Sequence, residues 1–231
     1  MVHYKLNEQI FPTNGNLAYP IFEAKIPLGM VAGKTVQPDL NLSVHARQIV
    51  WLLGRSGIGK TTILRKMARL HEDPRVDMKY RGVLYSQIAP RNWRRSILYV
   101  NQRPILFRGS VRENIFKPFG LKLNRDKVPN LDLVVKLLRK VDLSDSFLER
   151  DALTLSVGEM ARICLVRSLL MNPDVLLLDE PTASLDSESR IAVAITLKEW
   201  LSQTNSGIIG VTHDETLTEM IPGLEIHLGQ S

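Results

Sequence analysis

A glycine-rich loop between an apolar run and an amphipathic helix constrains this chain more than any other feature. Residues 54–61 read GRSGIGKT, which fits the pattern G-x-x-x-x-G-K-[ST], and the apolar run QIVWLLG leads into them. Glycines let successive backbone N–H groups turn inward around phosphate oxygens, and the N-terminus of the following helix adds a partial positive charge. The pattern therefore predicts a strand, a phosphate loop and a helix that together bind a nucleoside triphosphate.

Two residues at the end of this loop carry the chemistry that a triphosphate needs. The ammonium group of Lys60 is placed to neutralise the β- and γ-phosphates, and the hydroxyl of Thr61 is placed to bind Mg²⁺. The expected nucleotide-binding residues are Gly54, Arg55, Ser56, Gly57, Ile58, Gly59, Lys60, Thr61 and Thr62. The helix after them is expected to have an apolar face, made of Ile63, Leu64, Met67 and Leu70.

Short apolar runs alternate with amphipathic stretches along the rest of the chain. Helices are expected at 131–143 and 187–203, the second with Ser187 as its N-cap. Strands are expected in the runs SGIIGVTHD and LEIHLG and at residues 48–54, 96–102 and 174–181. Strands that alternate with helices favour an α/β fold, here a P-loop NTPase core around a mostly parallel central sheet.

Two regions interrupt this alternation. The first 45 residues contain short alternating segments separated by prolines, which is typical of antiparallel strands and turns. Residues from about 104 to 170 are mainly helical and break the series of strands. We therefore expect a single domain over residues 1–231. Its parts are an N-terminal antiparallel β subdomain (about 1–45), a P-loop core (about 46–103 and 171–231) and an inserted helical subdomain (about 104–170).

Two carboxylates follow an apolar run at the place where an open α/β sheet binds its ligands. Asp179 and Glu180 end the run VLLL, and the carboxyl ends of parallel strands face the ligand crevice of such a sheet. Because Mg²⁺ prefers oxygen ligands, Asp179 is expected to bind the metal. Successive strand residues point in different directions, which leaves Glu180 to polarise an attacking water. Without the phosphate loop, the pair would also fit two solvated carboxylates in a turn.

Composition and charge exclude several classes of protein. Hydrophobic residues make up 44% of the chain and charged residues 23%, as in globular domains, and no apolar run is long enough for a membrane-spanning helix. The net charge of +6 is scattered, so it does not by itself indicate a nucleic-acid partner. The only cysteine, Cys164, lies in an apolar run and is expected to be buried. No secretory signal is visible, so we expect a cytoplasmic protein.

Six motifs in order resemble those of the ATP-binding-cassette (ABC) ATPase family. They are GRSGIGKTT, YVNQ, LSVGE, VLLLDEP, TASLD and VTHD, and they cover nearly the whole chain. The resemblance implies that the chain binds ATP with Mg²⁺ and hydrolyses it, with Glu180 acting on the attacking water. It implies that Gln102 reaches the Mg²⁺ and this water, beside the metal ligands Thr61 and Asp179. It also implies that His213 contacts the γ-phosphate and that Asp186 communicates across a dimer.

The segment LSVGE resembles the family signature LSGGQ. In this family two ATPase domains pack head to tail, and each bound ATP contacts the signature of the other subunit. The resemblance therefore implies a homodimer on ATP binding, with the partner's ATP contacted by Ser156, Val157, Gly158 and Glu159. The following helix, expected from about Met160, would point its positive N-terminus at the γ-phosphate.

Two residues depart from that signature. Val157 replaces a glycine, and a β-branched residue would be strained if the position required a positive φ. Glu159 replaces a glutamine, and its negative charge would oppose ATP unless the side chain is turned away. Both changes are expected to slow or weaken closure of the dimer.

The stretch after Gln102 bears on the direction of transport. Residues 103–116, RPILFRGSVRENIF, resemble a stretch common in exporter-type ATPases. There Phe107 would line the groove that receives a coupling helix of the membrane subunit, or else pack in the core. The resemblance implies a subunit that drives a separate membrane-spanning permease, held by it on the cytoplasmic face of the cell membrane. Small two-component exporters, including those for metal efflux, are the branch it resembles.

Two other functions stay open at this point. A soluble, non-transport ABC ATPase that acts on ribosomes or nucleic acid would normally carry tandem cassettes, a long coiled coil or a basic insertion. A P-loop kinase would need an acceptor site and lid arginines, and it would leave LSVGE and TASLD unexplained. Transport is the favoured interpretation, and nucleic acid is not an expected partner.

Overall fold

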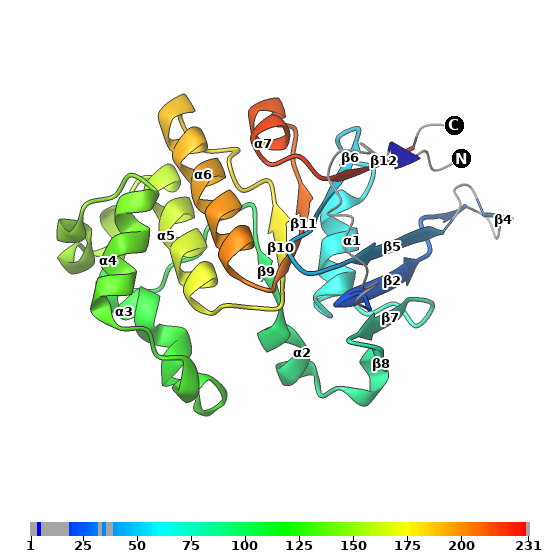
Figure 1. Cartoon of the computed structure of the whole chain (residues 1–231), viewed down its shortest axis with the longest axis horizontal. Helices are drawn as coiled ribbons and strands as arrows, with labels where there is room; N and C mark the ends of the chain where they lie inside the picture. The colour runs from blue at the N-terminus through cyan, green and yellow to red at the C-terminus, as the bar shows by residue number, and fades with distance from the viewer. Residues whose placement is uncertain (1–3, 6–18, 32–33, 36–38, 230–231) are drawn as a thin grey trace.

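The computed structural model describes residues 4–5, 19–31, 34–35 and 39–229 of the 231-residue chain. Within this part of the chain, the largest sheet has six strands, of which only the edge strand β1 is antiparallel (Figure 1). In spatial order its strands are β1 (Tyr4–Lys5), β12 (Leu224–Leu228), β6 (Ile49–Gly54), β11 (Gly207–Val211), β10 (Val175–Asp179) and β9 (Ile97–Val100). The predicted α/β fold with a mostly parallel central sheet is confirmed.

A second sheet is antiparallel. In spatial order its strands are β5 (Leu40–Val44), β2 (Phe22–Ile26), β7 (Asp77–Tyr80) and β8 (Val83–Leu84). A short hairpin follows β2 and is formed by β3 (Met30–Val31) and β4 (Lys34–Thr35). Antiparallel strands predicted in the first 45 residues are present, although residues 6–18 of that region lie outside the described part. The sheet also takes in β7 and β8, which the sequence pattern did not predict.

Helices cover the sheets. The α-helices are α1 (Lys60–Met67), α2 (Pro90–Ser96), α3 (Val111–Phe116), α4 (Leu131–Lys140), α5 (Val157–Leu170), α6 (Ser187–Gln203) and α7 (Glu215–Met220). Short 3₁₀ helices are η1 (Tyr85–Gln87), η2 (Lys117–Gly120), η3 (Lys122–Lys127), η4 (Asp145–Glu149) and η5 (Ala152–Thr154). Among the described residues, none of these helices combines the length and the apolar character needed to cross a bilayer.

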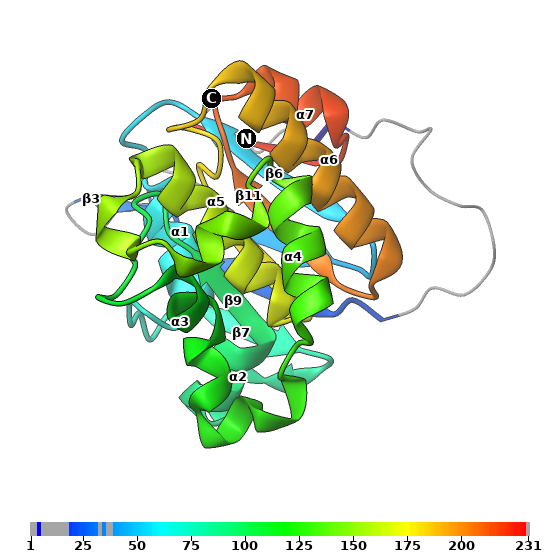
Figure 2. The ribbon, with the colours of Figure 1, turned by 90° about the vertical axis from the view of Figure 1, so that its left-hand side faces the viewer.

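The parallel sheet is covered on both faces, and alternation along its strands divides the core in two. Leu177 and Ile209 pack with α1 and the antiparallel sheet on one face. Leu176 and Ile208 pack with α5 and α6 on the other, and Figures 1 and 2 show the helical part of the chain on this side. Strands buried on both faces need a continuous apolar run, which explains the sequence VLLL. The predicted burial of Cys164 on α5 is also confirmed.

Two helix boundaries differ from the prediction. Helix α1 ends at Met67, so Leu70 is not part of its apolar face and is 54% exposed. The N-cap of α6 is Asp186, not Ser187, because the Asp186 carboxylate accepts a hydrogen bond from the N–H of Ser189 at 2.8 Å. Ser187 is instead the first helical residue.

A tryptophan occupies the space beside a glycine in the parallel sheet. Trp51 of β6 is fully buried, and its indole N–H donates to the carbonyl oxygen of Ile221 at 2.9 Å. Gly210 of β11 lies opposite Trp51 in the strand register. A Cβ atom at Gly210 would lie 2.2 Å from Cζ3 of Trp51, so only glycine leaves room for the ring. This packing fixes the strand that leads into the phosphate loop.

We expect Gly210→Ala to lower the free energy of unfolding by about 1–3 kcal/mol, because an extra methyl group in a packed core forces its neighbours to move. Gly120→Ala is the matched control: a Cβ there would meet no described atom within 4 Å, so its effect should stay within about 0.5 kcal/mol. Chemical denaturation of both variants gives the comparison. Equal stability would mean that Trp51 can shift without cost.

Candidate functional site

The loop after β6 has the backbone of an anion-binding nest. Gly57 and Gly59 have φ angles of 80° and 98°, a left-handed conformation that glycine adopts without strain. Gly59 is also the N-cap of α1, so the first N–H groups of the helix follow the loop directly. Ile58 packs against the core between the two sheets and anchors the loop. The predicted segment 54–62 therefore forms a cradle suited to phosphate groups.

Lys60 is a buried cation at the centre of the site. Its Nζ donates to the carbonyl oxygen of Gly54 at 2.7 Å and to that of Arg55 at 3.1 Å. It also lies 3.2 Å from Nε2 of His213. Burial lowers the pKa of Lys60, while the charges of Glu180 and Asp179 act to raise it. The structure thus sets one ammonium group against two carboxylates and an imidazole.

Asp179 is fully buried, and each of its oxygens has a different partner. Oδ1 accepts a hydrogen bond from the hydroxyl of Thr61 at 3.0 Å, and Oδ2 accepts one from the hydroxyl of Tyr99 at 2.7 Å. Burial, together with the hydrogen bond to Asp179, raises the pKa of Tyr99 well above its ordinary value. The tyrosine hydroxyl therefore remains a donor to the carboxylate at any physiological pH.

The oxygens of Thr61 and Asp179 fit a Mg²⁺ ion. Mg²⁺ takes oxygen ligands in octahedral geometry, in which adjacent ligands lie about 3 Å apart. The two side-chain oxygens lie 3.0 Å apart at the end of the phosphate loop. Gln102, the third predicted metal ligand, is exposed in the bend after β9. It follows the strand that pairs with β10, but the side-chain partners of Asp179 among the described residues are Thr61 and Tyr99.

Glu180 leaves the strand in a left-handed conformation. Its φ angle is 50°, which costs a non-glycine residue on the order of 1–2 kcal/mol, and its N–H donates to the carbonyl oxygen of Val211 at 2.9 Å. This turn brings Oε1 of Glu180 to 3.5 Å from Nε2 of His213, the residue two positions beyond the end of β11. The structure therefore brings together Lys60, Asp179, Glu180 and His213, which come from three separate motifs.

The signature segment caps helix α5. The Ser156 hydroxyl accepts a hydrogen bond from the N–H of Glu159 at 3.2 Å, and the Glu159 carboxylate accepts one from the N–H of Ser156 at 2.7 Å. This reciprocal pair is a capping box, and it starts the helix at Val157. The prediction of a start near Met160 was wrong because it did not take account of the serine and glutamate acting together.

The start of α5 bears on both departures from the signature, while slower closure of the dimer stays a prediction. Val157 is the first residue of α5, its φ is not among the positive values, and it is 53% exposed. The condition for strain at Val157 is therefore not met, because the backbone there is helical and accepts a β-branched residue. The Glu159 carboxylate also accepts a hydrogen bond from Arg150 at 3.1 Å. Although burial acts to raise the pKa of Glu159, the bonds to Ser156 and Arg150 lower it, so the charge is held within its own subunit.

Gly158 of the signature packs against the segment that leads to Asp186. A Cβ atom at Gly158 would lie 3.0 Å from the carbonyl oxygen of Ser184 and 3.4 Å from Cδ2 of Leu185, so the signature packs closely on the segment that leads to Asp186. Asp186 accepts hydrogen bonds from the N–H and the hydroxyl of Ser189, and these lower its pKa. The structure gives Asp186 a capping role, and its communication across a dimer stays a prediction.

Phe107 lies on the surface. Its ring is 50% exposed, and Nζ of Lys117 lies 4.6 Å from the ring centroid. Its N–H donates to Oδ1 of Asn114 at 2.7 Å, which fixes the loop before α3. Ile105, two residues earlier, is exposed as well. Of the two interpretations of Phe107, a surface residue fits the structure and a core residue does not.

The structure adds two residues that sequence reasoning missed. Tyr99 holds Asp179, and Asp214 accepts a hydrogen bond from the hydroxyl of Thr182 at 2.8 Å. The second bond ties the segment after Glu180 to the residue after His213. Tyr99 lies in the quoted motif YVNQ, but its role depends on how β9 and β10 pair. The only local signal was the tyrosine itself.

A family model described as "ABC transporter" matches residues 38–183, more than half of the chain. The chain belongs to the ABC transporter family. It is an ATPase, since the ATP-binding subunits of this family hydrolyse ATP to drive transport. The phosphate loop, Asp179 and Glu180 all lie within the matched residues, whereas His213 lies beyond them.

Named relatives of this ABC ATPase come from several transport systems. It is 31% identical to the probable iron export ATP-binding protein FetA of Escherichia coli (strain K12), over 81% of this chain and 83% of that protein. It is 29% identical to the nickel import ATP-binding protein NikE of Brucella suis biovar 1 (strain 1330), over 86% of this chain and 77% of that protein.

Among solved structures, the chain is similar to cbiO1 from Clostridium perfringens, which is part of the ABC transporter complex cbiONQ. The TM-score is 0.68 at 25% identity, over 84% of this chain and 79% of that one. These likenesses agree with the α/β P-loop fold and with an ATP-binding subunit of a transport system. Because one named relative exports and another imports, they do not distinguish the two directions.

Proposed function

We propose that this chain is the ATP-hydrolysing subunit of an ABC exporter, that it works as a homodimer, and that it drives a separate membrane-spanning permease. The observation that carries the proposal is the convergence of five side chains at the carboxyl ends of β6, β10 and β11. These side chains are Lys60, Thr61, Asp179, Glu180 and His213. No single motif would place a buried cation, two carboxylates and an imidazole around a phosphate loop.

The phosphate loop binds and orients ATP. Its inward N–H groups and the N-terminus of α1 hold the phosphates, and Lys60 neutralises charge on the β- and γ-phosphates. Thr61, Asp179 and Gln102 would hold Mg²⁺, which when bound supplies positive charge to the phosphate oxygens. Before ATP binds, Lys60 interacts with the carboxylates of Asp179 and Glu180. When the triphosphate binds, Lys60 would interact with the phosphates in place of these carboxylates.

Glu180 and His213 act on the far side of the γ-phosphate. The Glu180 carboxylate polarises the attacking water and accepts its proton, while His213 contacts the γ-phosphate. The left-handed backbone of Glu180 and its hydrogen bond to Val211 hold the carboxylate beside His213. The bond between Thr182 and Asp214 joins the two segments that carry these residues, which keeps the pair together.

The second copy completes each site. Ile163 of α5 belongs to the core on one face of the parallel sheet, and Leu64 of α1 belongs to the core on the other. The signature of one chain is therefore assigned to the ATP of its partner, contacted through Ser156, Val157, Gly158 and Glu159. The exposed Ser156 and the start of α5 support this assignment, and Asp186 would report contact between the copies.

The permease would bind at the exposed residues Ile105 and Phe107, beside the helical subdomain. The exporter-like stretch 103–116 favours export, and the names of the relatives FetA and NikE both concern metal ions. We infer metal-ion efflux, with the subunit held on the cytoplasmic face of the cell membrane by its partner. No nucleic-acid partner is proposed.

Co-purification tests the transport function. We expect a membrane-spanning permease to co-purify with the tagged chain, and we expect the ATPase rate of the complex to rise with the transported metal ion. Phe107→Ala should reduce recovery of the permease because it removes the exposed ring, whereas Leu84→Ala, at an exposed residue of the antiparallel sheet, should not. Recovery of ribosomes in place of a membrane protein would support the soluble alternative.

A further inference from the structure

A tyrosine on the neighbouring strand reaches the predicted metal ligand. Tyr99 of β9 lies opposite Leu177 in the register, and Asp179 is two residues further along β10 on the same face. Diagonal neighbours on paired strands lie roughly 7–8 Å apart, which a long aromatic side chain can bridge. The hydroxyl of Tyr99 bridges this gap and donates to Oδ2 of Asp179 at 2.7 Å.

The two hydrogen bonds of Asp179 fix its orientation. Oδ1 accepts from the Thr61 hydroxyl at 3.0 Å while Oδ2 accepts from Tyr99, and the whole side chain is buried. Rotation of the carboxylate would break both bonds and leave buried oxygens without donors, which is costly. Because Tyr99 occupies Oδ2, Oδ1 is the oxygen that stays beside Thr61.

The ring and the hydroxyl of Tyr99 have separable parts in the structure. The ring packs against the core between the two sheets, a place that phenylalanine would fill equally well. The hydroxyl donates to Asp179 and has two lesser interactions, a long contact of 3.5 Å with Oδ1 of Asn101 and one with Arg65. The function of the hydroxyl is therefore to be sought at Asp179.

We propose that Tyr99 is a positioning residue for the metal ligand Asp179, and that its hydroxyl turns Oδ1 toward Thr61 so that the two oxygens can bind one Mg²⁺ ion. The proposal rests on the proposed function, in which Thr61 and Asp179 bind Mg²⁺ with ATP. It concerns a residue of β9 that lies outside the phosphate loop and is not one of the predicted metal ligands. Removing a group that hydrogen-bonds to a metal ligand commonly lowers metal affinity by about 10–100-fold.

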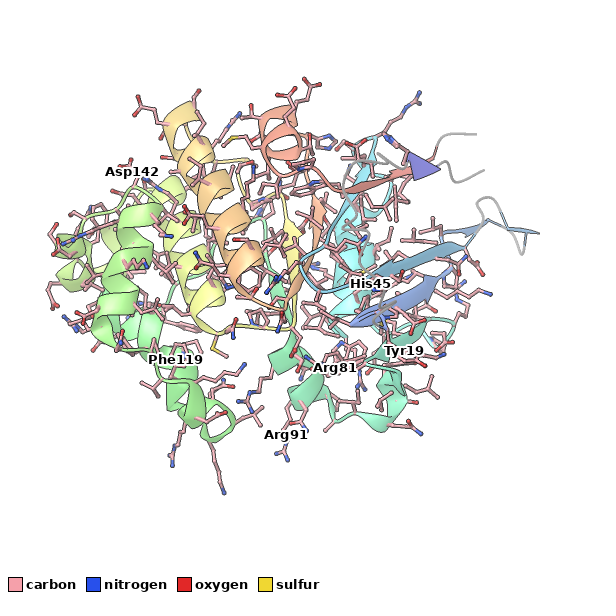
Figure 3. The ribbon with its side chains drawn as sticks, viewed as in Figure 1. Tyr19, His45, Arg81, Arg91, Phe119 and Asp142 are labelled. Atoms are coloured by element: carbon pink, nitrogen blue, oxygen red, sulfur yellow. The ribbon has the colours of Figure 1, made fainter. Side chains whose placement is uncertain are left out.

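A second tyrosine–aspartate hydrogen bond, at the other end of β10, provides a matched control. Tyr80 donates to Oδ2 of Asp174 at 2.8 Å, and Asp174 directly precedes β10. The other oxygen of Asp174 accepts from Arg81, which Figure 3 shows beside the antiparallel sheet. The two tyrosine–aspartate bonds thus lie at opposite ends of β10. Of the two aspartates, Asp179 is the one that also accepts a hydrogen bond from Thr61.

We expect Tyr99→Phe to weaken binding of the metal about tenfold. Mn²⁺ serves as the probe, and its binding to the full chain with a non-hydrolysable ATP analogue is measured by electron paramagnetic resonance. Affinity for a fluorescent ATP analogue in excess EDTA should stay at the wild-type value, because the phosphate loop is untouched. Tyr80→Phe should match the wild type in both measurements. Unfolding temperatures of the two variants show that each is folded.

The outcomes separate this inference from the proposed function. Wild-type Mn²⁺ affinity in Tyr99→Phe would overturn the inference and leave the proposed function standing. An equal loss of nucleotide affinity with and without metal would also overturn it, since the hydroxyl would then support the fold and not the metal ligand. If the wild-type chain bound no Mn²⁺ together with the nucleotide, both would fail.

Discussion

Glu180→Gln is expected to lower the rate of ATP hydrolysis by at least about 100-fold while leaving ATP binding intact. A glutamine amide cannot accept the proton of the attacking water, and general base catalysis typically contributes 10²–10⁴-fold. The substitution keeps the size of the side chain and the backbone bond from residue 180 to Val211. Without hydrolysis, the ATP-bound pair of subunits should persist as a stable dimer.

Phosphate release measures the rate, and light scattering after gel filtration measures the dimer with and without ATP. Glu215→Gln is the matched control, because Glu215 is an exposed carboxylate in the first turn of α7, two residues after His213. It should turn over like the wild type and form no trapped dimer. Full turnover by Glu180→Gln would remove Glu180 from the base role. A monomer that binds ATP but does not hydrolyse it would contradict the sandwich.

Lys60→Ala is expected to weaken nucleotide binding by at least about 100-fold. The variant loses the one ammonium group held between the phosphate loop and the two carboxylates. Hydrogen bonds to charged groups contribute about 1.5–3 kcal/mol each, so losing those to two phosphates is enough for this effect. The negative charges of Asp179 and Glu180 would also face the triphosphate without the neutralising cation.

Titration with a fluorescent ATP analogue measures this affinity. Lys25→Ala is the control for loss of one positive charge, because Lys25 is an exposed residue of β2 whose ion pair with Asp39 lies at the surface. It should bind the analogue like the wild type. The unfolding temperature shows whether Lys60→Ala is folded. A folded variant that bound nucleotide with unchanged affinity would show that the phosphate-loop assignment is wrong.

The parts of the fold that were predicted correctly depend on local sequence. Runs of four or more apolar residues followed by charged or glycine residues indicated β6 and β10, and the loop GRSGIGKT indicated the start of α1. The arrangement of Lys60, Asp179 and His213 followed from motif order, because parallel strands deliver their carboxyl ends to one edge of the sheet. Such features need no knowledge of which strands pair.

The features that were missed depend on contacts between distant segments. The bond from Tyr99 to Asp179 depends on the register of β9 against β10. Strand β7 joins the antiparallel sheet by pairing with β2, which is distant in sequence. Short amphipathic strands such as β7 show little period of their own. The end of α1 at Met67 is a different case, because it is a local feature that the continuing apolar spacing to Leu70 did not indicate.

The start of α5 could have been predicted. The sequence Ser-Val-Gly-Glu fits the capping-box pattern of serine followed three residues later by glutamate, which alone places the N-cap at Ser156. The family signature LSGGQ has a glycine and a glutamine where this chain has Val157 and Glu159, and that difference does not indicate a capping box. In the structure, the glutamate supplies a bond to the backbone N–H of Ser156 that starts the helix.

That capping box also sets the character of the serine hydroxyl. Oγ of Ser156 accepts the N–H of Glu159, and an oxygen that accepts a hydrogen bond becomes a stronger donor through its own hydrogen. One of the two lone pairs of this oxygen is engaged within the chain, and the O–H of this exposed residue can still donate to another group. One intrachain bond therefore both begins α5 and polarises the hydroxyl that, in the proposed dimer, would meet the partner's ATP.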